Sequence, residues 1–81
     1  MTQHPGVHVK EWLQANRKSQ NELAEAMHVR PPFMSKIVNG HAHITPKVAL
    51  KLEAATGVNA STWASYEMEY SLSRARGEVA Y

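Results

Sequence analysis

The stretch Ser19-Gln-Asn-Glu-Leu-Ala-Glu-Ala-Met-His-Val-Arg-Pro-Pro-Phe-Met-Ser-Lys-Ile-Val-Asn-Gly40 predicts two short helices joined by a tight turn. Ser19, followed three residues later by Glu22, forms the capping-box pattern that begins a helix. Arg30 precedes a proline and is therefore pushed out of helical geometry, which places the turn at residues 28–30. Gly40 ends the second helix, because glycine takes the left-handed conformation without steric cost. The stretch is therefore interpreted as a helix-turn-helix motif over about residues 19–40.

Three more helices are expected around this motif. The first covers about residues 5–16, since Pro5 suits an opening helical turn. Another covers about 46–56, with Thr45 as N-cap, and the last covers about 59–76, with Asn59 as N-cap. Apolar residues recur at helical spacing. Those expected to face inward are Val9, Trp12, Leu13, Leu23, Ala24, Met27, Met34, Ile37, Val38, Ile44, Ala49, Leu52, Ala55 and Trp63.

The length of 81 residues favours a single small domain. A chain of this size buries only about two-thirds of its unfolded surface, which suffices for one helical core and not for two. No strand pattern or internal repeat interrupts the helical segments. We therefore expect one all-α domain of five helices over residues 1–81.

The composition argues against several classes of protein. The chain has no cysteine and no aspartate, and its serines show no recognisable catalytic spacing with a histidine and an acid. His41 and His43 are the most tempting metal pair, but no carboxylate or thiolate stands near them in the sequence. We expect no enzyme activity, no cofactor and no metal. The chain also shows no secretion signal and no membrane span, so a cytoplasmic protein is expected.

The charge is unevenly distributed along the chain. Residues 1–51 carry seven basic and three acidic side chains, a net charge of +4, and residues 52–81 carry a net charge of −2. A basic front half suits a polyanion, and an acidic back half suits a different partner. A split of this size also arises easily by chance.

The second helix of the motif is predicted to enter the major groove of double-stranded DNA. Arg30, Pro32, Phe33 and Lys36 lie on its expected outer face. Arg30 or Lys36 can donate to guanine, and Phe33 can pack on a thymine methyl group. Pro31 and Pro32 remove two amides that would otherwise be available to a phosphate. Gln20 and Asn39 are expected beside the two sugar-phosphate strands, where contacts position the protein without reading sequence.

Several motifs resemble a known family. Ser19-Gln-x-Glu-Leu-Ala and Met34-Ser-x-Ile-Val-Asn-Gly40 resemble the XRE family, whose fold is that of the lambdoid phage repressors. His4-Pro-Gly, Glu11-Trp-Leu, Ile44-Thr-Pro, and Trp63 followed by Tyr70, are similar to the HigA group of antitoxins. The likeness extends from His4 to about Arg76.

The resemblance implies a function and a set of contact residues. It implies a homodimer that binds a palindromic operator at its own promoter and neutralises a small basic ribonuclease toxin. The base-reading positions implied are Arg30, Pro31, Pro32, Phe33, Ser35 and Lys36, and the phosphate-contact positions are Gln20 and Asn39.

Two positions depart from the family pattern. His28 stands where the family usually has a turn glycine, which often needs a positive φ angle. Histidine is among the more tolerant non-glycine residues in that conformation, so a modest strain is expected. Thr56 replaces a large apolar residue and is expected to loosen the end of its helix.

The last helix carries more aromatic and apolar surface than four short helices can cover. Trp63 is expected to complete the core, and Tyr66 and Tyr70 to form a dimer interface. Two alternatives remain open. One is a stand-alone phage or plasmid repressor without a toxin, and the other is an antitoxin that binds its toxin but has little DNA binding.

Overall fold

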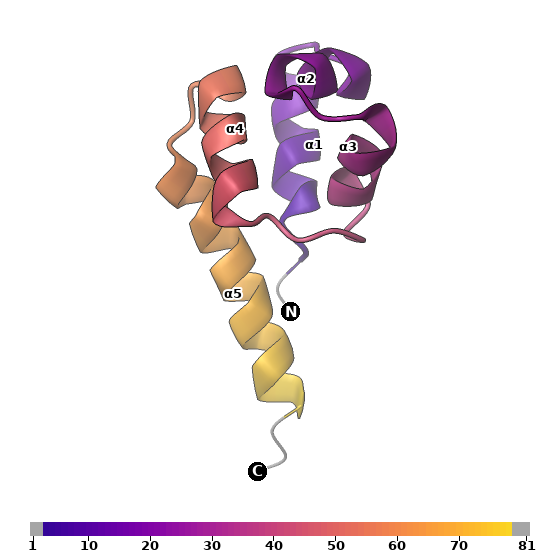
Figure 1. The fold of residues 1–81 in the computed structure, drawn as a ribbon. Coiled ribbons are helices and arrows are strands. Elements are labelled where there is room, and N and C mark those ends of the chain that lie inside the picture. Colours follow the sequence, from indigo (N-terminus) through magenta and orange to yellow (C-terminus); the bar gives the residue numbers. More distant parts are fainter. Residues whose placement is uncertain (1–2, 79–81) are drawn as a thin grey trace.

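The computed structural model describes residues 3–78, which form five α-helices (Figure 1). They are α1 (Gly6–Ala15), α2 (Gln20–Met27), α3 (Pro31–Val38), α4 (Pro46–Thr56) and α5 (Ala60–Glu78). The first four helices surround one core, and the C-terminal half of α5 projects away from them. The predicted all-α class is confirmed. No helix in the described range is both long and apolar enough to cross a bilayer.

The N-terminal caps of α2 and α4 are those that the sequence predicts. Ser19 Oγ accepts a hydrogen bond from the Glu22 amide at 3.1 Å, and Glu22 Oε1 accepts one from the Ser19 amide at 3.0 Å. Thr45 Oγ1 accepts from the Val48 amide at 3.3 Å. Each bond satisfies an amide that the first helical turn leaves without a partner. These two helices therefore begin at positions set by local sequence.

Helix α5 differs from its prediction at both ends. The Ala60 amide donates to Glu53 Oε2 at 2.9 Å, so a carboxylate from α4 caps α5 where the Asn59 side chain was expected to do so. The helix also continues through Gly77 to Glu78. A glycine permits the left-handed conformation that ends a helix but does not impose it, and nothing lies within 4 Å of where a Gly77 Cβ would be.

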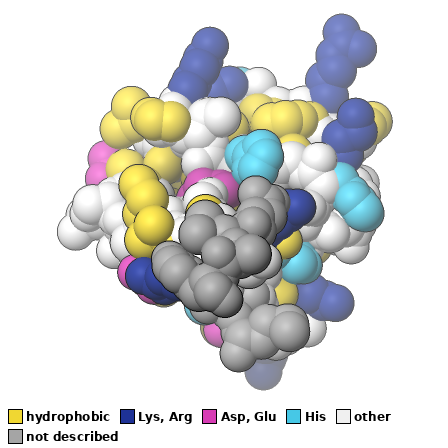
Figure 2. Space-filling view, turned by 90° about the horizontal axis from the view of Figure 1, so that it is seen from below, with side chains coloured by type: hydrophobic (Ala, Val, Ile, Leu, Met, Phe, Trp, Pro, Cys, Tyr) yellow, Lys and Arg dark blue, Asp and Glu magenta, His cyan; other side chains and the backbone are white. Residues whose placement is uncertain are grey.

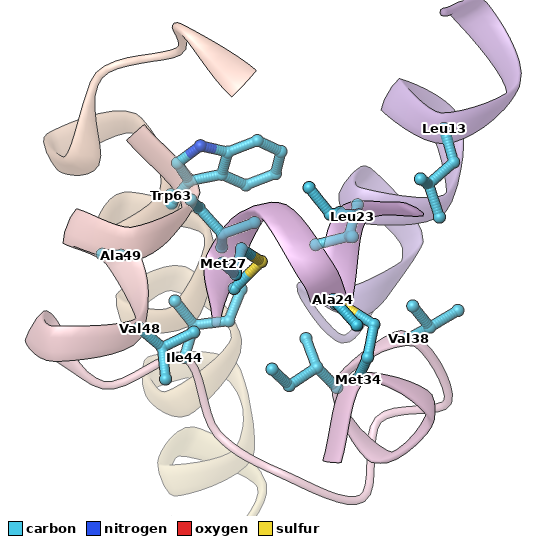
Figure 3. Packing of buried hydrophobic residues seen from close by; sticks show 13 residues of the cluster. Leu13, Leu23, Ala24, Met27, Met34, Val38, Ile44, Val48, Ala49 and Trp63 are labelled. Atoms are coloured by element: carbon cyan, nitrogen blue, oxygen red, sulfur yellow. The ribbon is translucent and has the colours of Figure 1, made fainter. Parts of the chain in front are cut away.

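The core contains thirteen buried hydrophobic side chains contributed by all five helices and the loop before α4 (Figure 3). Two residues expected to face inward, Trp12 and Ala55, are only partly buried, and Val48 is buried although it was not predicted. Thr56 does not leave the end of α4 loose. Its hydroxyl donates to the Leu52 carbonyl at 2.6 Å and accepts from the Val58 amide at 3.1 Å, so the threonine joins α4 to the next loop.

The start of α1 lies against the end of α3. A Cβ atom on Gly6 would lie 2.1 Å from the Ile37 carbonyl oxygen and 2.6 Å from that of Val38. The His4 ring covers Gly40, whose φ is +79°. The segment His4-Pro5-Gly6 therefore packs closely on α3, the helix that is predicted to read DNA. Only glycine at position 6 permits this approach, because any side chain there would overlap the α3 backbone.

Candidate nucleic-acid interface

The turn between α2 and α3 is fixed by backbone hydrogen bonds and one strained residue. His28 has φ 56° and ψ 42°, the left-handed conformation expected from its place in the motif. The Val29 amide donates to the Ala24 carbonyl at 3.0 Å, and the His28 amide donates to the Glu25 carbonyl at 3.1 Å. Ala24 is 1% exposed. A larger side chain there would separate the two helices, because their crossing is closely packed.

Helix α3 buries one face and exposes another. Met34, Ile37 and Val38 are buried, whereas the exposed face carries Arg30, Pro31, Pro32 and Lys36. Phe33, expected on the outer face, is half-buried and packs partly against the core. Its ring is therefore shared between the protein interior and the surface.

The beginning of α3 offers little to an anion. Residues 31 and 32 are prolines without amide hydrogens, and the amides of Phe33 and Met34 both donate to the Arg30 carbonyl, at 3.0 and 3.1 Å. Arg30 itself is extended, with φ −75° and ψ 144°. The two prolines thus stiffen the start of the helix and leave side chains, rather than amides, to make contacts.

The beginning of α2 is different. Ser19 and Glu22 bond to each other, and no hydrogen bond within residues 3–78 uses the amides of Gln20 and Asn21. Amides at a helix N-terminus point outward and attract phosphate. The sequence predicts a phosphate contact for the side chain of Gln20 but not for these two amides. The capping box at Ser19 was the signal that could have located them.

Ser35 and Asn39 are joined to each other at the far end of α3. Asn39 Nδ2 donates to Ser35 Oγ at 3.2 Å. Asn39 is exposed and Ser35 is half-buried. This bond holds the Asn39 amide on the helix surface and leaves its carbonyl oxygen available.

The residues predicted to form the dimer interface are turned toward the body of the molecule. The Tyr66 ring stacks on His8 with centroids 3.7 Å apart and meets Trp63 edge-on at 6.0 Å. Tyr70 contacts His4 edge-on, and the Arg74 guanidinium lies 5.8 Å from the Tyr70 ring centroid. Both tyrosines are half-buried. The large apolar side chains that α5 exposes are Met68, at 60%, and Leu72, at 40%.

His43, in the loop after α3, helps to fix that loop. His43 Nδ1 lies 3.1 Å from Glu67 Oε2, and the Ile44 amide donates to Glu67 Oε1 at 2.7 Å. Glu67 thereby ties the loop that follows α3 to α5. No group of three or more potential metal ligands lies together in the described part of the chain.

The comparisons with known proteins agree with this geometry. Residues 9–63 match the helix-turn-helix family, which is more than half of the chain, and the protein belongs to that family. The regulator YddM of Escherichia coli K12, described as an uncharacterized HTH-type transcriptional regulator, is 32% identical over 75 residues, which cover 93% of this chain and 80% of the relative.

Two solved structures show which helix-turn-helix proteins this fold resembles in detail. The antitoxin HigA of Pseudomonas aeruginosa, solved with the higBA promoter, superposes with a TM-score of 0.90 at 29% identity, covering 96% of this chain and 86% of that one. An addiction-module antidote protein of the HigA family from Coxiella burnetii gives a TM-score of 0.86 at 26% identity, covering 95% and 85%. The resemblance to HigA-type members of the XRE group is confirmed. These are non-enzymatic regulators, in agreement with the prediction that the chain is not an enzyme.

Proposed function

We propose that this protein is a dimeric repressor that binds a palindromic operator in double-stranded DNA and acts as the antitoxin of a toxin–antitoxin pair. The observation that carries the proposal is the exposed face of α3, where Arg30 at the N-cap and Lys36 in the last turn lie on a helix whose opposite face is fixed in the core. A helix held in this way can present its side chains to base edges without reorganising. The promoter-bound HigA structure supports this use of the same fold.

Each predicted contact residue has a role in this proposal. Arg30 and Lys36 donate to bases, while Pro31, Pro32 and the exposed edge of Phe33 shape the start of the helix and make apolar contact. Ser35 orients Asn39 through the bond between their side chains. The side chain of Gln20, its backbone amide and the amide of Asn21 contact the phosphates of one DNA strand. Asn39 contacts the phosphates of the other strand.

A gel-shift assay with the DNA upstream of the gene tests the DNA-binding role. Arg30→Ala and Lys36→Ala should each weaken binding by about 1–3 kcal/mol if they contact bases, and Gln20→Ala should weaken binding to all sequences alike. Arg76→Ala, an exposed arginine near the end of α5, is the matched control and should bind as the wild type does. Affinity should also fall with salt, with a log–log slope of about −0.9 per phosphate contacted. Affinity that does not change with salt would contradict the proposal.

We place the dimer interface on α5, on the face that carries Met68 and Leu72. Tyr66 and Tyr70, the residues first expected there, support this face by packing α5 against His8 of α1 and against His4 in the segment before α1. An apolar groove of about 240 Å³ adjoins Met68 and is lined by Ile44, Pro46 and Ala64. In Figure 2 hydrophobic side chains are exposed on the side of α4 and α5, at the left. A two-fold axis through this face would repeat α3 about 34–36 Å away, one turn of DNA along.

The antitoxin role is supported by the two HigA-type structures, and the alternative of a stand-alone repressor is favoured by the likeness to a transcriptional regulator. Co-expression with the product of the adjacent gene distinguishes the antitoxin from the stand-alone repressor. A small basic ribonuclease that co-purifies with this protein, and that stops growth when expressed alone, supports the antitoxin. A chain that represses its promoter but retains no such partner is a stand-alone repressor, and one that retains the partner without shifting DNA is an antitoxin with a vestigial DNA face.

A further inference from the structure

We infer that the groove beside Trp12 is the surface that binds the basic toxin partner. It is a cavity of about 390 Å³ lined by residues of α1, α2 and α4, together with Lys18 in the turn before α2. This inference rests on the proposed antitoxin function and specifies which face of the protein performs it.

The floor of the groove is apolar. It contains the partly buried Trp12, Leu23 and the two small residues Ala26 and Ala55. Trp12 was expected to lie in the core, yet it packs at the edge of the core with part of its surface in the groove. A partly exposed tryptophan on a concave apolar surface is the kind of residue that contributes most to protein–protein affinity. The small side chains of the two alanines leave room for a partner's side chain.

The rim of the groove is acidic. Glu22 and Glu25 both line it, and hydrogen bonds from the backbone and side chain of Ser19 lower the pKa of Glu22, which keeps this carboxylate ionised. Lys18 is the one cation among the lining residues, and its Nζ lies 4.0 Å from Glu22 Oε2 with both side chains more than half exposed. A pair this open is weak, so a cation from a partner can replace Lys18.

These charges select the class of partner. Two carboxylates repel a nucleic acid and attract a basic protein, and the toxin implied by the proposed function is small and basic. None of the eight residues predicted to contact DNA lines the groove, and neither does Asn21, whose amide is proposed to contact a phosphate. The toxin surface and the DNA surface are therefore built from different residues, and one dimer has separate surfaces for both partners.

Ala26 offers a clean test because its side chain is exposed and leaves the core untouched. Ala26→Arg fills the groove and places a cation beside Glu22 and Glu25. Ala54→Arg makes the same change at an exposed alanine of α4 that lies outside the groove. The probe is the purified basic protein encoded next to this gene, titrated against the full-length chain by calorimetry. Both variants should melt as the wild type does and shift the operator normally.

We expect Ala26→Arg to weaken toxin binding by a factor of about ten or more, and Ala54→Arg to change it less than about twofold. Trp12 also provides a spectroscopic signal. Trp63, the second tryptophan, is 2% exposed, so toxin binding should shift the fluorescence of the wild type and not that of Trp12→Phe.

Normal toxin affinity in Ala26→Arg would overturn the assignment of the groove while leaving the antitoxin function intact. The same holds for a fluorescence shift that persists in Trp12→Phe. A wild-type chain that does not bind the basic protein at all would overturn the antitoxin function, and the groove assignment with it.

Discussion

His28 stores strain at the turn between the two helices of the motif. Its φ of 56° lies in the left-handed region, where a residue with a Cβ atom is destabilised by about 1–2 kcal/mol. Arg17, after α1, is the other non-glycine residue with a positive φ in the described range. The sequence identified the strain at His28 through its place in the motif, but no such pattern marks Arg17.

Replacing His28 with glycine should stabilise the protein. Glycine removes the steric cost but increases the entropy of the unfolded chain, so we expect a net gain of about 0.5–1 kcal/mol. Thermal unfolding measures the effect. Ala54→Gly, at an exposed position within α4, is the opposing control and should lose about 1 kcal/mol. A lower melting temperature in His28→Gly would show that the imidazole makes a contact that offsets the strain.

The element that depends most on local sequence is α2, which is eight residues long. A helix this short has little stability by itself, and its capping box compensates by satisfying amides at its first turn. Ser19→Ala should therefore destabilise the protein by about 1 kcal/mol. It should also weaken DNA binding, because Gln20 and the free amides are positioned by the same turn. Chemical denaturation and the gel shift together test this.

The capping box also makes stability depend on pH. Hydrogen bonds from the backbone and side chain of Ser19 lower the pKa of Glu22 below its ordinary value of 4.5 in the folded protein. A lowered folded pKa gives stability that is present above 4.5 and is lost as the pH falls through the folded value. Melting curves between roughly pH 3 and 7 should show wild type losing more stability than Glu22→Gln over that window. Glu69→Gln should follow the wild type. Parallel curves for wild type and Glu22→Gln would contradict this.

Helix α5 gives the described part of the chain its elongated shape. The described chain extends 44 Å along its longest axis and 21 Å along the others, and the outer part of α5 accounts for the elongation. Met68 and Leu72 are exposed there without a partner in the monomer. Exposed apolar surface on a projecting helix favours association with a second copy.

Met68→Lys should convert the proposed dimer to a monomer, because a charge at the centre of an apolar interface is not compensated. Light scattering with size-exclusion chromatography checks the mass. Operator affinity should fall when the dimer is lost, since a monomer contacts only one half-site through its single α3 helix. Glu69→Lys, one residue along α5, controls for charge. A wild-type chain that remains a monomer at micromolar concentration would refute the dimer.

The exposed and buried positions of α3 could be predicted in large part from the sequence. The capping box, the paired prolines and the final glycine define both helices of the motif by local chemistry. Arg30, Pro31, Pro32 and Lys36 are exposed as expected, but Phe33 is half-buried, and neither the bond between Ser35 and Asn39 nor the available amides of Gln20 and Asn21 could be read from spacing. Those features depend on rotamers and on backbone geometry that several conformations of the same sequence permit.

Local sequence thus determined where four of the helices begin, which family the chain belongs to and which face of α3 is buried, because caps, prolines and helical periodicity act over a few residues. The tertiary structure decided what the aromatic and acidic residues do. Tyr66 and Tyr70 turn inward onto His8 and His4, and Glu67 and Glu53 bond to backbone amides on other segments. Trp12 lies at the edge of the core, with part of its surface in a groove, rather than inside the core. Each of these outcomes depends on which distant segment lies opposite, and helical spacing carries no information about that.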